Sequence, residues 1–536
     1  MRFVSLLGVA VLLFLAFLMS NNRRAIRPRI ILWGIGLQLL FAAIILGGKA
    51  LSSTGMFVFL SLILLYLFAE QIQNAGELPR KIGMSAAVIA GGAAVAAAGY
   101  FLDQVGVATI ASLLLFVTIL YAGYAKLTTL RHFLTGGFLA VGFGIIQARE
   151  ITGQDIMANI SGKVDQFLQL TNYGTGFLFG NIVSPTFRDQ FGFQFALGAL
   201  PTIIFFAAFM SIMYHFGVIQ IIIQGMTKFM RWTMGTSGAE TLSCTSNIFV
   251  GQTEAPLLIK PFLQKMTLSE LTTIMVGGFA TIAGGVLALY ISFGIDPGHL
   301  IAASVMSAPA ALVIGKIIFP ETETSETMGD DVKMPEIQKT DNVIEAASNG
   351  ITDGLKLAVN VAAMLLGFIA LVALLDVILN FFDSIIDGQL LGGAMVPVAA
   401  NPYSPVTEQH LGIFPGSLSV LFGHVFKYLA FVMGTPWQDS EAVGNLLGLK
   451  LSVNELVAYT TLGTYKAANE ISMRAEIIST YALCGFANFA SIGIQLGGIS
   501  AIAPERKKDL AKVGFKAMLG GAIASWITAS IAGLIL

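Results

Sequence analysis

Long apolar segments recur along the whole chain and are separated by short polar or glycine-rich segments. Most of them have about 18 residues or more, which is long enough for a helix to cross ~30 Å of hydrocarbon. The pattern predicts an all-α polytopic membrane protein. The twelve expected spans are residues 3–20, 30–48, 55–73, 82–101, 105–124, 132–148, 194–223, 270–294, 298–319, 352–382, 476–499 and 513–535.

Positively charged residues indicate how these spans are oriented. Four arginines lie between residues 23 and 29, and further loops that carry Lys or Arg fall on the same side if all twelve segments cross. The positive-inside rule makes that side cytoplasmic, so we expect both termini to be extracytoplasmic. The segment from Phe3 to Met19 has no small-residue cleavage site, and its charges follow it, so we expect a retained helix and not a signal peptide.

Composition agrees with a protein that lies in a lipid bilayer. Charged residues make up 11% of the 536 residues and hydrophobic ones 55%, whereas soluble domains carry about 25% charged residues. Mean hydropathy is +0.79. The net charge of −1 offers no basic surface, so no nucleic-acid partner is expected. The two cysteines, Cys244 and Cys484, lie in apolar segments and are expected to be buried, without a disulfide or a metal site.

Two parts of the chain repeat the same order of motifs. In each part Met-Gly-Thr (234–236 and 433–435) is followed by a glutamate (254 and 455), then by Gly-Phe-Ala (278–280 and 485–487), then by Ala-Pro (308–309 and 503–504). Internal repeats with interrupted hydrophobic segments at matching places are typical of secondary transporters, which bind substrate and ion between the repeats. We expect the repeats to be inverted.

Each repeat places a carboxylate in a segment that is too short to cross. Residues 238–265 hold charge and proline in their middle, and each arm of the segment has only roughly 20 Å of helix. We predict a re-entrant helical hairpin with Gln252, Thr253 and Glu254 at its tip, and a second hairpin that turns near Glu455. A carboxylate at the bilayer centre costs at least ~2.5–3.5 kcal/mol. Two at equivalent positions favour a shared polar ligand over structural pairing with buried lysines.

Glycine-rich segments that follow the hairpins predict two broken transmembrane helices. Residues 280–285 and 486–493 place hydroxyl or amide side chains beside glycine, with Thr281 and Asn488 at equivalent positions. Glycine lets the backbone unwind and frees carbonyls for a cation, although close helix packing is an alternative reason for small residues. Carboxylates, amides and the ring of Phe486 together suit a neutral polyhydroxylated ligand that carries a flat ring.

At these residues the chain resembles the concentrative nucleoside transporter family. The matching motifs are GQTEAPLL (251–258) with Lys260-Pro261, GFATIAG (278–284), NELVAY (454–459), ALCGFAN (482–488) and APER (503–506), and the resemblance covers about 1–48 and 163–536. It implies Na⁺-coupled nucleoside uptake across the cell membrane (inner or plasma membrane), and no enzymatic activity. It also implies a homotrimer in which each protomer has a scaffold domain and an elevator-like transport domain.

The resemblance also assigns roles to individual residues. It implies nucleobase contacts from Gln252, Thr253, Glu254 and Val286, ribose contacts from Glu455, Asn488 and Ser491 with Phe486 lining the same site, and a Na⁺ site made of Asn247, Thr281 and the carbonyls of Val250 and Ile282.

The expected organisation has eight parts. They are two N-terminal spans (1–50), a four-span insert that is extra relative to compact family members (51–162), interfacial and scaffold helices (163–231), the first repeat (232–319), a soluble acidic linker (320–346), a scaffold helix (347–387), an irregular connection with an interfacial segment (388–432) and the second repeat (433–536). The insert has few polar residues outside its loops and is expected to be peripheral scaffold.

Three alternatives remain open. A H⁺-coupled member of the same family could use Glu254 as its proton carrier, but Asn247 together with Thr281 favours Na⁺. An intramembrane hydrolase would need a nucleophile and a base, and the five histidines lie away from the motifs that bear Ser and Thr. A channel would show neither saturation nor trans-acceleration.

Overall fold

The computed structural model describes residues 1–124, 128–183, 195–198, 200–328, 340–391 and 413–536, and these residues are helical with connecting turns. The predicted all-α class is confirmed. Eight helices in the described ranges are long and apolar enough to span a membrane. The chain divides into two compact units, residues 39–159 and residues 1–38 with 160–536.

The smaller unit holds most of the predicted insert. It contains the end of α2 (Pro28–Leu46), α3 (Lys49–Leu67), α4 (Ala69–Gln73), α5 (Leu78–Gln104), α6 (Ala108–Tyr124), α7 (Thr128–Ala148) and the start of α8 (Gly153–Gln169). Its core is formed by Leu60, Leu64, Ala96 and Ala140. The α5 and α7 helices pack closely because Gly144 faces the Ala96 carbonyl, which a Cβ would overlap. The expected span 55–73 is divided, since its helix ends at Leu67.

The larger unit begins with helices that precede the two repeats. They are α1 (Arg2–Leu18), the short helix η1 (Arg23–Ala25), the start of α2, the rest of α8, α9 (Thr171–Phe179), η2 (Gly180–Val183), α11 (Phe195–Gly198), α12 (Leu200–His215) and α13 (Val218–Met234). The prediction of one span over 194–223 is wrong. The helix ends at His215, because Gly217 takes a left-handed conformation (φ 76°) and a new helix starts after it.

The two repeats supply the remaining helices of the larger unit. The first repeat contains α14 (Gly238–Ser246), η4 (Ala255–Ile259), α15 (Lys260–Leu263), α16 (Leu268–Ala280), α17 (Gly284–Ser292) and α18 (Pro297–Ile318). The connecting part contains α19 (Val343–Asp383), η5 (Ser384–Leu390) and α20 (Leu418–Val432). The second repeat contains η6 (Trp437–Asp439), α21 (Ser440–Ser452), α22 (Glu455–Ala467), α23 (Met473–Leu483), α24 (Phe489–Ile502), η7 (Pro504–Arg506) and α25 (Lys507–Ile535).

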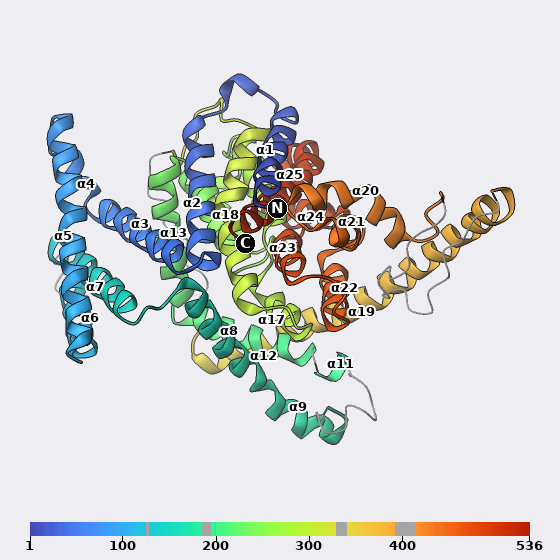
Figure 1. Ribbon diagram of the computed structural model, residues 1–536, viewed down its shortest axis with the longest axis horizontal. Coiled ribbons are helices and arrows are strands. Elements are labelled where there is room, and N and C mark those ends of the chain that lie inside the picture. Colours follow the sequence, from blue (N-terminus) through green and yellow to red (C-terminus); the bar gives the residue numbers. More distant parts are fainter. Residues whose placement is uncertain (125–127, 184–194, 199, 329–339, 392–412) are drawn as a thin grey trace. The chain divides into compact units, whose positions relative to one another are not determined.

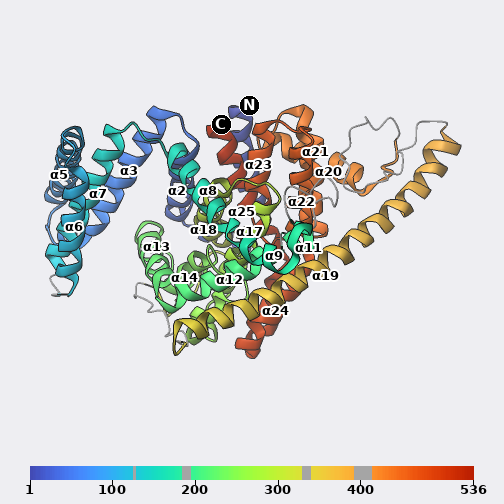
Figure 2. The ribbon, with the colours of Figure 1, turned by 90° about the horizontal axis from the view of Figure 1, so that it is seen from below.

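Three helices form the buried centre of the larger unit. The most apolar stretch of residues 268–292, which hold α16 and α17, is 83% buried. The corresponding stretches of α18 and of residues 504–535, which hold α25, are 89% and 83% buried, whereas that of residues 369–390, at the end of α19, is only 11% buried. Helices α16, α18 and α25 pack against one another, and α1 packs on α18 and α25. Figure 1 shows α1, α18 and α25 near one another. Figure 2 shows α19 as one long helix that runs past α12, with which it packs. The irregular segments of the repeats are therefore connected to the most buried helices of this unit.

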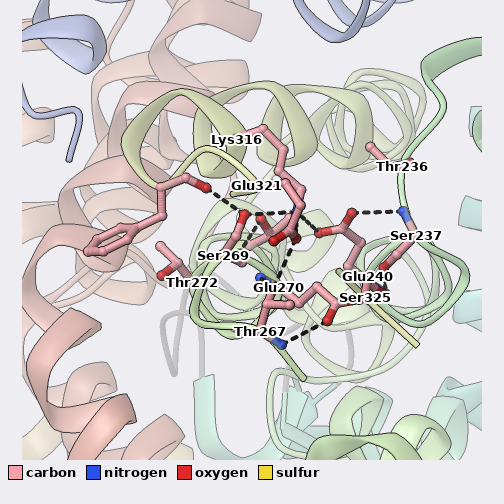
Figure 3. A network of polar contacts seen from close by, with 12 residues as sticks. Thr236, Ser237, Glu240, Thr267, Ser269, Glu270, Thr272, Lys316, Glu321 and Ser325 are labelled. Atoms are coloured by element: carbon pink, nitrogen blue, oxygen red, sulfur yellow. Dashed lines mark hydrogen bonds and ion pairs between the residues drawn. The ribbon is translucent and has the colours of Figure 1, made fainter. Parts of the chain in front are cut away.

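A buried charge network joins the start of the first hairpin to the centre (Figure 3). The Lys316 ammonium on α18 lies 2.7 Å from Glu240 Oε2 and 3.1 Å from Glu321 Oε2, and it donates to Ser269 Oγ at 2.9 Å. All these side chains are buried. Glu240 also caps α14 together with Ser237 in a capping box. The network therefore ties together α14, α16, α18 and the segment after α18.

The acidic segment after α18 was expected to be a solvated linker, and this is wrong for its first part. Glu321, Ser325 and Thr327 are buried. Ser325 Oγ donates to Glu270 Oε1 at 2.6 Å, and the Thr327 carbonyl accepts from the Gly238 amide at 3.0 Å. The segment is held because its polar groups complete the hydrogen bonds of two helix N-termini. Residues 329–339, like residues 392–412 of the expected irregular connection, lie outside the described residues.

Candidate functional site

The first hairpin has one helical arm and one irregular arm. Its outgoing arm, α14, has nine residues and ends at Ser246, and its return arm has only the 3-10 helix η4 and one turn of α helix. The prediction of two arms of similar helical length is therefore wrong. Between the arms the Gly251 amide donates to the Glu254 carboxylate, which closes the tip on itself. Because Glu254 stays exposed in the protein, its carboxylate can still reach a ligand.

The second hairpin turns sharply between two helices. Val453 and Asn454 connect α21 to α22, and Asn454 Oδ1 accepts from the Val457 amide at 2.9 Å, which makes Asn454 the N-cap. Glu455 follows as the first residue of α22 and is buried. The positive end of the helix dipole favours a carboxylate at this position. The prediction that Glu455 lies at a hairpin turn is confirmed.

Both predicted helix breaks are present, and they contact each other. The first runs from Thr281 to Ala283, between α16 and α17, and the second runs over residues 484–488, between α23 and α24. Gly485 has a φ of 129°, and a Cβ there would overlap the Phe279 carbonyl at the end of α16. Only glycine suits this crossing, because other residues rarely adopt such a φ and have no room for the side chain.

Glu455 is held by one partner on α17 and one in the second break. Asn488 Nδ2 donates to Glu455 Oε2 at 3.2 Å, and the Tyr290 hydroxyl on α17 donates to Glu455 Oε1 at 3.2 Å. Asn488 is itself the N-cap of α24, since its Oδ1 accepts from the Ser491 amide at 2.9 Å. The Tyr290 ring stacks on Tyr459, with ring centroids 4.4 Å apart. The carboxylate is therefore oriented before any ligand arrives.

The tip of the first hairpin meets α24 further along. Gln495 Nε2 donates to Gln252 Oε1 at 3.0 Å, and both side chains are buried. Thr253 packs against Gly498, because a Cβ added to Gly498 would lie 2.9 Å from Thr253 Cγ2. Asn488 and Gln495 are seven positions apart, or about 10 Å along the helix. One face of α24 thus joins the predicted ribose side, at Glu455, to the predicted base side, at Gln252.

The residues of the predicted Na⁺ site also lie close together. Asn247 Nδ2 donates to the Ser243 carbonyl at 3.1 Å, and its Oδ1 is buried without a hydrogen-bond partner in the described ranges. Thr281 Oγ1 donates to the Gly277 carbonyl at 2.8 Å, which leaves its lone pairs for another ligand. A Cβ on Gly277 would lie 3.5 Å from Asn247 Nδ2, so both side chains flank this glycine. Buried neutral oxygens of this kind suit a hard cation.

The backbone between these residues is linked as well. The Gly284 amide, at the start of α17, donates to the Phe249 carbonyl at 3.2 Å. Val250 and Ile282, whose carbonyls are the other predicted ligands, therefore belong to two segments that are bonded to each other. Val286 is 8% exposed in the first turn of α17, and Phe486 is half-buried in the second break.

Sequence reasoning missed Tyr290 and Gln495. Both lie inside apolar helices, where a polar group needs a partner. That requirement was the available signal for each, but the identity of the partner depends on the tertiary packing.

Three family models match the chain. They are the Na⁺ dependent nucleoside transporter N-terminus over residues 7–63, the nucleoside recognition (Gate) model over residues 196–296, and the Na⁺ dependent nucleoside transporter C-terminus over residues 299–533. The N-terminal match continues to residue 63, further than the expected 48.

Curated relatives agree with these models. The uncharacterized transporter YutK of Bacillus subtilis (strain 168) is 38% identical over 405 residues, covering 76% of this chain and 93% of its own length. Sodium/nucleoside cotransporter 2 of Mus musculus is 40% identical over 407 residues, which are 73% of this chain but only 57% of that relative. The chain thus spans less than two thirds of the length of the mammalian cotransporters it matches.

Solved structures match as well. CNTnw in an inward-facing substrate-bound state has a TM-score of 0.70 and 31% identity, covering 100% of this chain and 98% of that chain. A CNTnw variant in an outward-facing state has a TM-score of 0.71 and 30% identity, covering 100% and 97%.

The chain belongs to the concentrative nucleoside transporter family. This is a family of transporters and not of enzymes, and its members are multi-pass integral membrane proteins. The resemblance stated from the motifs is confirmed.

Proposed function

We propose that this chain is a Na⁺-coupled nucleoside symporter of the cell membrane. One observation carries the proposal. A buried carboxylate, Glu455, has both oxygens held by Tyr290 and Asn488, and the helix that bears Asn488 reaches Gln252 on the opposite hairpin. A carboxylate accepts from hydroxyl groups, and an amide can bond a nucleobase edge. The two ends of this arrangement therefore fit the two parts of a nucleoside.

In this proposal Glu455, Asn488 and Ser491 bind the ribose hydroxyls. Gln252, Thr253, Glu254 and Val286 contact the base, and Phe486 lines the same space. Na⁺ binds Asn247, Thr281 and the carbonyls of Val250 and Ile282. The buried Asn247 Oδ1, which accepts no hydrogen bond from the described residues, supports a cation there. Because Asn247 belongs to the hairpin and Thr281 to the helix break, a bound Na⁺ would fix one against the other.

The transport cycle follows from this coupling. Na⁺ binds first and orders the tip of the first hairpin, the nucleoside then completes the site, and the transport domain moves inward as an elevator. We further propose that the protein is a homotrimer in the lipid bilayer, with both termini extracytoplasmic. The boundaries predicted for the domains, including the insert at 51–162, remain part of this proposal.

Uptake into proteoliposomes tests the function. Purified protein should accumulate uridine, adenosine or both when Na⁺ is higher outside, and should not do so when K⁺ replaces Na⁺. Glu455→Gln should raise KM about tenfold or more, because hydrogen bonds to a charged group contribute about 1.5–3 kcal/mol. Glu150→Gln is a matched control, because Glu150 only forms an exposed pair with Lys49.

Two results would change the assignment. No uptake of any nucleoside by the unmutated protein would refute transport. Uptake that persists without Na⁺ and collapses with a protonophore would replace Na⁺ by H⁺ as the coupling ion.

A further inference from the structure

Two buried glutamine side chains connect the first hairpin to α24. Gln495, which is 1% exposed, donates through Nε2 both to Gln252 Oε1 at 3.0 Å and to the Met275 carbonyl of α16 at 3.2 Å. A Cβ on Gly278 would lie 2.5 Å from Gln495 Nε2 and 3.0 Å from Gln252 Cβ. The glycine therefore leaves the space in which the two amides meet, beside a backbone carbonyl.

The chemistry of these three groups fixes which way each amide faces. A backbone carbonyl can only accept, so the atom of Gln495 that faces Met275 must be the NH₂ nitrogen. The second hydrogen of that nitrogen points to Gln252, which must then present its oxygen. Turning the Gln252 amide over would bring two NH₂ groups face to face and leave a buried donor unpaired. The packing therefore favours one orientation, in which both hydrogens of Gln495 Nε2 are used and Gln495 Oε1 is buried without a hydrogen-bond partner among the described residues.

The NH₂ group of Gln252 is then left for another partner. No acceptor for Gln252 Nε2 is found in the part of the chain that the structure describes. We propose that Gln495 is a positioning residue that holds this NH₂ group toward the ligand, so that the base side of the site selects a nucleobase edge with a hydrogen-bond acceptor. A carbonyl oxygen or an unprotonated ring nitrogen meets this requirement, and a ring N–H does not. The inference rests on the proposed function, because it assumes that Gln252 contacts the base.

Single-atom analogues test the proposal by binding. Kd is measured calorimetrically on the purified protein at saturating Na⁺ for two parent nucleosides and their acceptor-deleted forms. These are cytidine with 3-deazacytidine, and adenosine with its 1-, 3- and 7-deaza analogues. At least one deletion should weaken binding to the unmutated protein by about 5–10-fold, as expected for one lost hydrogen bond.

Gln495→Met keeps the length of the side chain but removes its NH₂ group. We call the ratio of the Kd of an acceptor-deleted analogue to the Kd of its parent the penalty. In Gln495→Met the penalty for the analogue that binds weakly to the unmutated protein should fall below about twofold, because Gln252 can then turn over and offer its oxygen instead. Gln252→Leu should abolish the penalty alone, and adding Gln495→Met to it should change the penalty no further. Ser500→Ala, on the same helix, removes only a bond to the Gly497 carbonyl and should keep the full penalty.

Gln252→Glu gives a second test if Gln495→Met does not fold. A carboxylate accepts from Gln495 and presents only an acceptor to the ligand, so the acceptor-deleted analogue should bind at least as well as its parent.

Three results would overturn the inference. Gln495→Met could weaken parents and analogues by the same factor, as a purely structural role would. Gln252→Glu could retain the full penalty, or no acceptor deletion could matter to the unmutated protein. If the unmutated protein bound no nucleoside at all, the proposed function would fall together with the inference, which distinguishes that failure from the other three.

Discussion

Tyr290→Phe removes one of the two side-chain hydrogen bonds that orient Glu455. The tyrosine hydroxyl donates to Glu455 Oε1 at 3.2 Å, and the remaining bond, from Asn488 to Oε2, has the same length. The ring itself is retained, so its stacking on Tyr459 should persist. The substitution therefore tests whether orientation of the carboxylate contributes to nucleoside binding.

The magnitude follows from the cost of ordering a side chain. With both oxygens held, Glu455 is already fixed before the ligand binds. With one bond lost, binding must also order the carboxylate, which costs about 0.5–1.5 kcal/mol for a side chain with several rotamers. We expect the Kd for nucleosides to rise about two- to tenfold.

The assay is calorimetric titration of nucleoside into the purified variant at saturating Na⁺, with Tyr459→Phe as the matched control. The Tyr459 hydroxyl donates to the Thr480 carbonyl at 2.8 Å, and the described residues show no hydrogen bond between Tyr459 and Glu455. Tyr459→Phe should therefore lower thermal stability while leaving Kd within about twofold. An unchanged Kd in Tyr290→Phe, or an equal change in both variants, would refute the reasoning.

Three further substitutions test other features. Gly485→Ala should abolish the monodisperse peak in size-exclusion chromatography, because the φ of 129° at Gly485 disfavours a side chain and a Cβ would overlap the Phe279 carbonyl of α16. Gly493→Ala should keep that peak, because a Cβ at Gly493 would meet no atom within 4 Å. Asn247→Leu should raise the Na⁺ concentration for half-maximal uptake severalfold, because it removes a buried unpartnered oxygen, and an unchanged Na⁺ dependence would contradict the site. Lys316→Met should lower the free energy of unfolding by about 3–5 kcal/mol, since it leaves buried carboxylates unpaired. Lys265→Met is the control, because it breaks only an exposed ion pair with Glu326 and should lower the free energy of unfolding by less than about 1 kcal/mol. Thermal unfolding of both variants measures the difference.

Polar residues inside apolar segments could be predicted as site residues from the sequence alone. Glu254 and Glu455 were found because a carboxylate in a hydrophobic segment is costly and therefore informative. The two breaks were found because glycine beside Thr281 and Asn488 interrupts a helical pattern at matching places. Such signals are local in the chain, so no tertiary information was needed.

The missed features depend on partners that are distant in sequence. Gln495 and Tyr290 look like isolated polar residues in apolar helices, and only the fold brings them to Gln252 and Glu455. The segment that begins at Glu321 looked solvated because its charges are dense. Burial there became favourable only through partners on α16 and α18, which hydropathy along the chain cannot reveal.

The Lys316 network also has a consequence for how the chain is made. Glu240 is synthesised 76 residues before Lys316 (316 − 240), its buried ion-pair partner. At about 5–20 residues per second, the carboxylate would wait roughly 4–15 s for its lysine during synthesis. Helix α14 therefore cannot reach its final electrostatic environment on the ribosome until α18 has nearly been completed. Until Lys316 has been synthesised, we therefore expect the Glu240 carboxylate to stay in contact with water or with the membrane-insertion machinery.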